Sequence, residues 1–196
     1  MANLVVHSTR TRKNVIIMGV LVAFFLFLLA FDLYAWLGKG FFHPMELAFE
    51  LFILLLIYER MAGKYTYELG KKSLLITKNG MFGRKIVHEV YYKDIFGVYL
   101  YKAKLIGYIK FRKTFRFNSA LDGRDVWVVG YEVPADKGKK HNYRLYIKPT
   151  PEMLAELERK MPNKVHSTEE KTVQKLVTEE IEVEKQANNE TAKADQ

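Results

Sequence analysis

The chain of 196 residues contains no cysteine, which excludes disulfides, thiolate metal ligands and a cysteine nucleophile. Such a composition fits a reducing compartment. No Ser-His-Asp order and no glycine loop with the lysine and helix of a phosphate site is present. The five histidines have no acids around them at ligand spacing and are predicted to be ordinary surface or edge residues: His7, His43, His88, His141 and His166. We therefore expect a protein without catalytic activity, cofactor or metal.

Two apolar runs close to the N-terminus predict membrane helices. The first, Val15 to Leu37, has 23 residues and one charge, Asp32. At about 1.5 Å per residue, a helix of this length crosses a hydrocarbon core of about 30 Å. The second run, Met45 to Tyr58, is shorter and carries Glu46 and Glu50. It lies near the lower limit for a span, and a buried or interfacial helix is the alternative.

A cleaved secretory signal is the alternative for the first run, because Arg10, Arg12 and Lys13 precede it. The run is longer than a signal core of about 7 to 15 residues, and a second apolar run follows at once. A retained helical hairpin fits better, with a turn over residues 38–43 and Pro44 in the first turn of the second helix.

Basic residues are distributed unevenly between the two ends of the apolar runs. The hairpin turn offers Lys39 and His43, whereas more cations lie before the first run and after the second: Arg10, Arg12, Lys13, Arg60, Lys64, Lys71 and Lys72. The positive-inside rule then predicts a multi-pass protein of the cell (inner) membrane with both termini in the cytoplasm.

Charge is distributed unevenly along the chain. Residues 59–161 contain 22 Lys and Arg against 11 Asp and Glu, a net charge of +11. Residues 162–196 contain 5 against 8, a net charge of −3. A basic domain tethered at the cytoplasmic leaflet faces anionic lipid, and each cation near that surface adds about 1 kcal/mol of attraction.

Apolar residues between positions 64 and 148 alternate with a period of two, which predicts a β domain. Asn79-Gly80 is a strong hairpin signal. The expected strands are Tyr65–Leu69, Ser73–Lys78, Met81–Val90, Tyr92–Tyr101, Lys104–Phe117, Asp125–Val133 and Asn142–Lys148. Ile95, Val98 and Leu100 are the expected buried residues of the fourth strand.

The period changes after Pro149. Met153, Leu154, Leu157 and Met161 recur at helical spacing, and Thr150-Pro151-Glu152 is good chemistry for a helix start. The sequence therefore predicts about seven strands in one curled sheet and a closing helix over Thr150 to Met161.

The order of strands and terminal helix resembles a pleckstrin-homology (PH) fold. The stretches Leu74 to Lys85 and Tyr92 to Val98, with their strand, glycine turn and I-x-x-V step, resemble the bacterial PH-like membrane-protein families. The similarity covers roughly Lys64 to Met161, and those families commonly carry two membrane helices before the domain. The resemblance implies a membrane-anchored PH-like domain, an open barrel or curled antiparallel sheet with one C-terminal helix. The basic loop after Pro134 and the acidic tail depart from the pattern.

Clustered cations are the first candidate site. They are predicted to contact anionic lipid headgroups or a protein partner through phosphate or carboxylate oxygens. A solvated sheet face whose cations serve only solubility and topology is the alternative. Nucleic acid is disfavoured by the short membrane tether and the absence of a reading motif. The residues are Lys102, Lys104, Lys110, Arg112, Arg116, Lys137, Lys139, Lys140 and Arg144.

Three membrane carboxylates are the second candidate site. Glu46 and Glu50 share a helix face, and Asp32 lies at a similar depth on the first helix. Ionisable groups within spans are costly and often functional, so the three could hold a proton or cation. Alternatively they extend to the interface and pair with Lys39 or His43.

The tail after Pro162 is rich in Glu, Lys, Thr, Asn and Ala, which predicts disorder. Val173, Leu176, Val177 and Ile181 repeat at helical spacing, and a short docking helix is the alternative.

Together these patterns predict a membrane-anchored, noncatalytic binding or scaffolding protein. The alternative is an accessory subunit of a membrane transport or envelope-assembly complex that uses the membrane carboxylates. The predicted organisation is a basic N-terminus (1–13), membrane helices (14–37 and 44–60) around an external turn (38–43), a PH-like domain (64–161) and an acidic tail (162–196).

Overall fold

The structure is a computed structural model that describes residues 4–40, 43–80, 84–102, 109–135 and 140–194. It divides the chain into two compact units. The first unit combines residues 1–89 with residues 117–124, and the second combines residues 90–116 with residues 125–196.

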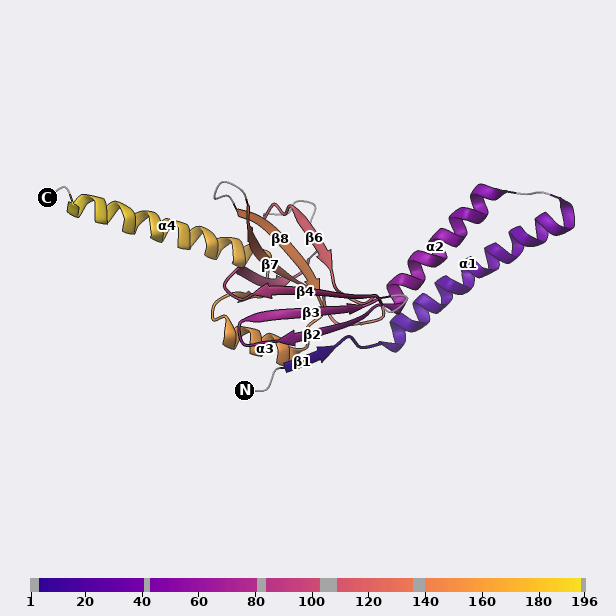
Figure 1. Cartoon of the computed structure of the whole chain (residues 1–196), viewed down its shortest axis with the longest axis horizontal. Coiled ribbons are helices and arrows are strands. Elements are labelled where there is room, and N and C mark those ends of the chain that lie inside the picture. Colours follow the sequence, from indigo (N-terminus) through magenta and orange to yellow (C-terminus); the bar gives the residue numbers. More distant parts are fainter. Residues whose placement is uncertain (1–3, 41–42, 81–83, 103–108, 136–139, 195–196) are drawn as a thin grey trace. The chain divides into compact units, whose positions relative to one another are not determined.

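The first unit contains two apolar helices, α1 (Arg12–Lys39) and α2 (Pro44–Ala62), which lie side by side (Figure 1). None of the residues of α1 is buried, and large apolar side chains such as Val20, Phe27 and Leu37 are exposed around it. An apolar surface of this kind suits hydrocarbon rather than water. Among the described residues, α1 is the one helix long and apolar enough to cross a membrane.

The first unit also carries most of a four-stranded sheet in the order β1-β2-β3-β4. Side chains of β2 and β3 alternate, and Tyr67, Leu69, Leu74 and Ile76 are at most 1% exposed. Tyr67 is paired with Ile76, and Leu69 with Leu74, so the buried residues share one face. The strands are β1 (Leu4–His7), β2 (Lys64–Leu69), β3 (Ser73–Asn79) and β4 (Lys85–Tyr91).

The second unit contains a five-stranded sheet in the order β6-β8-β7-β5-β9. Neighbours β7 and β8, and β5 and β7, are antiparallel, whereas β6 pairs with β8, and β5 with β9, in parallel. Val98, Val129 and Leu145 are fully buried in its core. The strands are β5 (Ile95–Leu100), β6 (Lys113–Arg116), β7 (Trp127–Pro134), β8 (Lys140–Ile147) and β9 (Val165–His166).

Two helices follow β8 in the second unit. In α3 (Pro151–Lys160) the Thr150 hydroxyl accepts a hydrogen bond from the Met153 N–H at 3.2 Å, and Met153 and Leu157 are fully buried. The helix predicted there, with its cap, is confirmed. The last helix is α4 (Glu169–Ala194), which contacts β5 and β9.

Three expectations differ from the structure. The strands form two sheets rather than one, because β4 is not paired with β5 in the described part of the chain. In addition β1, which precedes α1, and β9 each add a strand that was not expected. The long strand expected over residues 104–117 is reduced to Lys113–Arg116 in its described part. The tail expected to be disordered holds β9 and α4, and Thr172 on α4 is 1% exposed.

That burial depends on a close approach of α4 to β5. A Cβ placed on Gly97 would lie 2.5 Å from Cγ2 of Thr172, so the strand accepts the helix only where a side chain is missing. Composition alone does not reveal such a contact, which explains why the sequence predicts a disordered tail.

Candidate functional site

Parallel pairing of β6 with β8 gathers arginines and aromatic rings on one face at the edge of the five-stranded sheet. Thr114 is opposite Arg144, and Arg116 is opposite Tyr146. Side chains alternate along each strand, so these four residues share a face. The backbone N–H of Arg112 donates to the Asn142 carbonyl at 2.9 Å and extends the pairing. We call this set the basic-aromatic face: Arg112, Thr114, Arg116, Arg144 and Tyr146.

Ring contacts and a hydroxyl fix the guanidinium of Arg144. Its Cζ lies 5.0 Å from the ring centre of Phe111 and 5.3 Å from that of Tyr146. Its Nε donates a hydrogen bond to Thr114 Oγ1 at 2.8 Å. Cation–π contacts of this kind contribute about 0.5 to 2 kcal/mol each. Arg144 is therefore held in one orientation rather than extended into solvent.

Other cations of the face differ in their surroundings. Arg116 is exposed, with Cζ 6.0 Å from the centre of the Tyr146 ring. Arg112 is exposed and contacts the Nε2 of His141. The face thus combines exposed and fixed guanidinium groups.

The structure brings only part of the predicted cation set together. Arg112, Arg116 and Arg144 meet on the basic-aromatic face, and Lys102 and Lys110 are exposed beyond the described end of β5 and before β6. Lys140 instead forms an ion pair with Glu132 at 2.6 Å. Lys104, Lys137 and Lys139 lie outside the described residues.

A cavity of about 300 Å³ lies beside Arg144 and has both signs of charge in its lining. Sequence reasoning did not include four of its residues: Tyr99, Tyr101, Phe111 and Glu169. Three of them were read as strand residues and Glu169 as part of a disordered tail. The only sequence signal for Glu169 was its position as an acidic residue ahead of a helical pattern.

The membrane carboxylates have unequal environments. Glu50 is 8% exposed, and its Oε2 is buried without a hydrogen-bond partner among the described residues. Glu46 is exposed, and its Oε2 lies 3.0 Å from Nδ1 of His43, the pairing offered as the alternative. Asp32, Lys39, His43 and Glu46 line one cavity of about 440 Å³. Glu50 is therefore buried, whereas its two predicted partners, Asp32 and Glu46, are more accessible to solvent.

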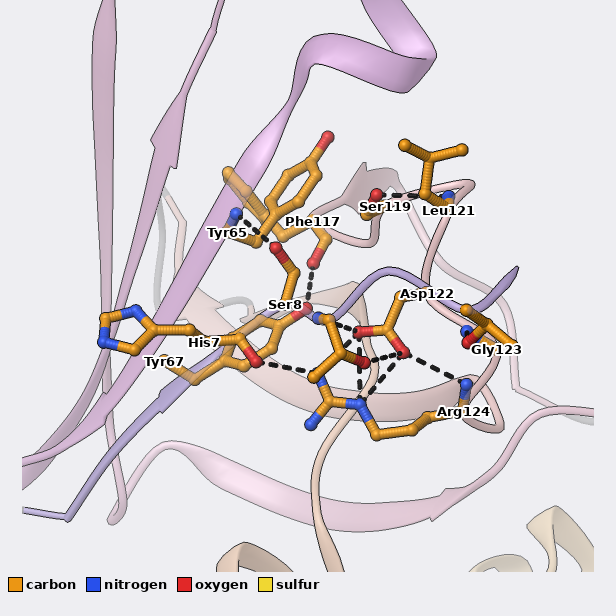
Figure 2. Close-up of polar contacts among 12 residues, drawn as sticks. His7, Ser8, Tyr65, Tyr67, Phe117, Ser119, Leu121, Asp122, Gly123 and Arg124 are labelled. Carbon is orange, nitrogen blue, oxygen red and sulfur yellow. Dashed lines mark hydrogen bonds and ion pairs between the residues drawn. The ribbon is translucent and has the colours of Figure 1, made fainter. Parts of the chain in front are cut away.

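A second polar cluster joins the residues before α1 to the segment 117–124 (Figure 2). The Asp122 side chain is fully buried and accepts hydrogen bonds from the Thr9 N–H at 3.1 Å and the Thr9 hydroxyl at 3.2 Å. Arg124 Nε donates to the same carboxylate at 3.0 and 3.1 Å. Arg124 Nη2 also donates to the His7 carbonyl at 3.0 Å. We call these four residues the Asp122 cluster.

Burial alone would raise the pKa of Asp122. The hydrogen bonds and charge of Arg124, together with the bond from Thr9, outweigh burial and hold the pKa below its ordinary value. The carboxylate is therefore charged at neutral pH.

The start of α1 is bonded to the same segment. The Thr11 N–H donates to the Leu121 carbonyl at 2.8 Å, and the Gly123 N–H donates to Thr11 Oγ1 at 2.8 Å. Asn14 Nδ2 donates to the carbonyls of Ala120 and Asp122 at 3.1 and 3.3 Å. These bonds fix the first turn of α1 on residues 120–123.

Within the described ranges, no group of three or more histidine, aspartate or glutamate side chains is arranged to hold a metal ion. Comparison of the chain with family models, with curated proteins and with solved structures finds no match.

Proposed function

We propose that the chain is a membrane-anchored, noncatalytic binding protein whose basic-aromatic face engages the anionic headgroups of phospholipids. The observation that carries this proposal is the parallel β6–β8 pairing, which sets Arg116 and Arg144 on one face with Tyr146. Guanidinium groups bind phosphate oxygens in a bidentate way.

Strand pairing across the helices supports a two-span anchor. β1 precedes α1, β2 follows α2, and the two strands are hydrogen-bonded neighbours. If α1 crosses the bilayer, α2 has to cross back for the strands to meet. With 19 residues, α2 is about 28 Å long, close to the hydrocarbon thickness.

Charge supports the orientation. Arg10, Arg12, Lys13 and Arg60 lie at the ends of α1 and α2 nearest the sheet, and Lys39 lies at the other ends. Positive residues favour the cytoplasmic side, so the sheets and both termini belong there. The order of β2 to β5, β7, β8 and α3 supports the bacterial PH-like resemblance, which remains part of this proposal. The parallel pairing of β6 with β8 departs from the antiparallel sheet that the resemblance implies.

Vesicle binding tests the lipid function with the full chain. The protein is held in phosphatidylcholine nanodiscs and floated with separate vesicles of phosphatidylcholine, with or without phosphatidylglycerol. We expect binding to the anionic vesicles only, weakening as salt rises from low ionic strength. Binding that is equal for both vesicle types contradicts the proposal.

A charge-reversal pair locates the binding face. Because each cation near the surface contributes about 1 kcal/mol, Arg112→Glu with Arg116→Glu should weaken binding by about 2 kcal/mol or more, roughly thirtyfold. Lys71→Glu with Lys72→Glu, in the exposed turn before β3, changes the net charge equally and is the control. Equal losses from the two pairs would mean that net charge, not this face, drives binding.

A second candidate function rests on Glu50, whose buried Oε2 has no partner in the described part of the chain. An unpaired carboxyl within a helix pair is destabilising unless something binds it. We propose as the alternative that the chain is an accessory subunit of a membrane complex and that Glu50 gains a polar partner when that complex forms.

Substitution of Glu50 tests this alternative function. If a subunit binds there, Glu50→Leu reduces the size of the complex on native gels of solubilised membranes, whereas Phe49→Leu, at an exposed position, leaves it unchanged. A complex of unchanged size in Glu50→Leu, with higher thermal stability, would reject the subunit contact.

A further inference from the structure

The cavity beside Arg144 has the chemistry of a binding site for a small molecule. It has a volume of about 300 Å³ and lies wholly within the second unit, among β5, β7, β8 and the start of α4. Its lining combines two cations, one acid and aromatic rings: Lys102, Arg144, Glu169, Tyr99, Tyr101 and Phe111. The exposed lining is mostly polar, and a few convergent charged groups beside aromatic rings favour a small polar ligand.

The cationic part of the cavity is preorganised. Thr114 and the rings of Phe111 and Tyr146 fix the plane of the Arg144 guanidinium. A guanidinium held in this way loses little conformational entropy when it binds a phosphate through two parallel hydrogen bonds. Lys102 adds a second positive charge to the lining.

The anionic part is equally fixed. Glu169 is the first residue of α4, and its Oε1 accepts a hydrogen bond from the Ile109 N–H at 3.3 Å. Burial raises the pKa of Tyr99, and the neighbouring Glu169 carboxylate raises it further, so the Tyr99 hydroxyl keeps its proton. A carboxylate beside aromatic rings is a suitable acceptor for an ammonium group.

Both charges in one small cavity disfavour a simple anion. A phosphate alone would meet Arg144 and Lys102 but would be repelled by Glu169. A cation alone would meet Glu169 but would be repelled by Arg144. A molecule with both groups complements all three charges.

We propose that this cavity binds a small zwitterion that carries a phosphate ester and a primary ammonium. The phosphate lies at Arg144 and Lys102, and the ammonium lies at Glu169 against the ring of Tyr101. Phosphoethanolamine has this chemistry, either free or as the headgroup of phosphatidylethanolamine. Only the headgroup form rests on the proposed lipid function, and the free form does not.

Calorimetric titration of the full chain in a maltoside detergent, which contains no phosphate, tests the proposal. The probes are O-phosphoethanolamine, inorganic phosphate and ethanolamine. We expect phosphoethanolamine to bind at least tenfold more tightly than either of the other two. Equal affinity for phosphoethanolamine and phosphate overturns the proposal, as does the absence of heat with all three.

Variants assign the two ends of the ligand. Glu169→Gln should abolish the tenfold preference and leave affinity similar to that for phosphate, and Arg144→Gln should remove binding of both phosphate compounds. The controls are Glu156→Gln and Arg159→Gln, an exposed ion pair on α3. If Glu169→Gln keeps the preference, the assignment of the ammonium is wrong. The comparison of probes on the unaltered chain stands even if Arg144→Gln fails to fold.

Vesicles distinguish the sources of the ligand. Flotation with phosphatidylcholine vesicles that contain phosphatidylethanolamine identifies the headgroup as ligand, whereas binding of the free compound without flotation identifies a soluble ligand. The two proposals can therefore fail separately. If the lipid function is wrong, binding to anionic vesicles is lost and the titration is intact. If the cavity proposal is wrong, the titration fails and binding to anionic vesicles is intact.

Discussion

Replacement of Asp122 by alanine should strongly destabilise the first unit. The carboxylate is fully buried and accepts hydrogen bonds from Thr9 and Arg124. Without it, Arg124 loses its only charged partner among the described residues, and Arg124 Nη1 already lacks a partner there. The Thr9 N–H loses its acceptor as well.

The magnitude follows from the burial of the two groups. Breaking a buried ion pair on one side costs about 3 to 5 kcal/mol, because the remaining charge is left without compensation. The Arg124 side chain is 19% exposed, so water can solvate part of it and the lower end applies. A loss of about 3 kcal/mol corresponds to a fall in Tm of roughly 6 to 12 °C.

Thermal melting of the full chain in detergent, followed by far-UV circular dichroism, measures the effect. Asp125→Ala is the matched control, since Asp125 is exposed and lies three residues away. In the double variant with Arg124→Ala, the cost should be smaller than the sum of the single costs, because no orphaned charge remains. A fall in Tm no greater than that of Asp125→Ala would refute the reasoning.

The pH dependence of this variant gives an independent check. Since the pKa of Asp122 is held below its ordinary value, the carboxylate stabilises the fold fully at pH values above about 4. That contribution is lost as the pH falls through the lowered pKa. The Tm difference between the natural chain and Asp122→Ala should be constant down to about pH 4 and then shrink.

Three further predictions concern the second unit. Thr150→Ala removes the hydroxyl that accepts from Met153 and should cost about 1 kcal/mol in a denaturant melt, whereas Thr150→Ser should retain most of the stability. Gly130→Ala places a Cβ 2.5 Å from Cζ of Phe96 and should lower the Tm, unless Phe96→Ala is present to open the space. Burial, and then the charge of a neighbouring tyrosine, raises the pKa of Tyr131 to about 12, so Tyr131 should be among the tyrosines that resist ionisation at pH 11 in an absorbance titration, together with Tyr92 and Tyr99. Tyr131→Phe should lower the number of resistant tyrosines by one.

Local chemistry predicted several elements correctly. The β3 strand was expected over Ser73–Lys78 and covers Ser73–Asn79, and the Gly80 N–H donates to the Arg84 carbonyl at 2.9 Å in the hairpin connection. The cap of α3 also depends only on neighbouring residues, which explains why sequence reasoning found it. Ile95 and Val98 are buried as expected, whereas Leu100 is only half-buried. The pairing of β5 with β7 shifts in register between Ile95 and Gly97, so the buried positions do not follow a simple period of two.

The region after residue 109 shows where periodicity fails. A strand was expected over residues 104–117, but of its described residues only Lys113–Arg116 form one, and the chain enters the first unit at Phe117. There the Phe117 carbonyl accepts a hydrogen bond from the Tyr67 hydroxyl at 2.6 Å. Alternation records which face is apolar and carries no information about where a strand stops pairing.

The N-terminal strand was missed for a related reason. Leu4–His7 holds four residues and precedes basic residues, so the segment resembles the leader of a membrane helix. It is a strand because β2 supplies its hydrogen bonds. Its side chains alternate between the two faces of the sheet, since Val6 is 8% exposed and Val5 is 45% exposed. A local sequence pattern cannot identify a strand partner as distant in the chain as Leu69 is from Leu4.

By itself, the sequence determined the apolar helix α1, the basic charge of residues 59–161, the alternation of the strands and the start of α3. These properties depend on side-chain hydrophobicity, formal charge and neighbours within one turn. Only the tertiary structure decided that β1 joins β2, that Arg124 neutralises Asp122, and that β6 lies parallel to β8 and collects Arg116 and Arg144 on one face. Strand partners and buried ion pairs are chosen by the packing of segments far apart in the chain, which composition and periodicity do not record.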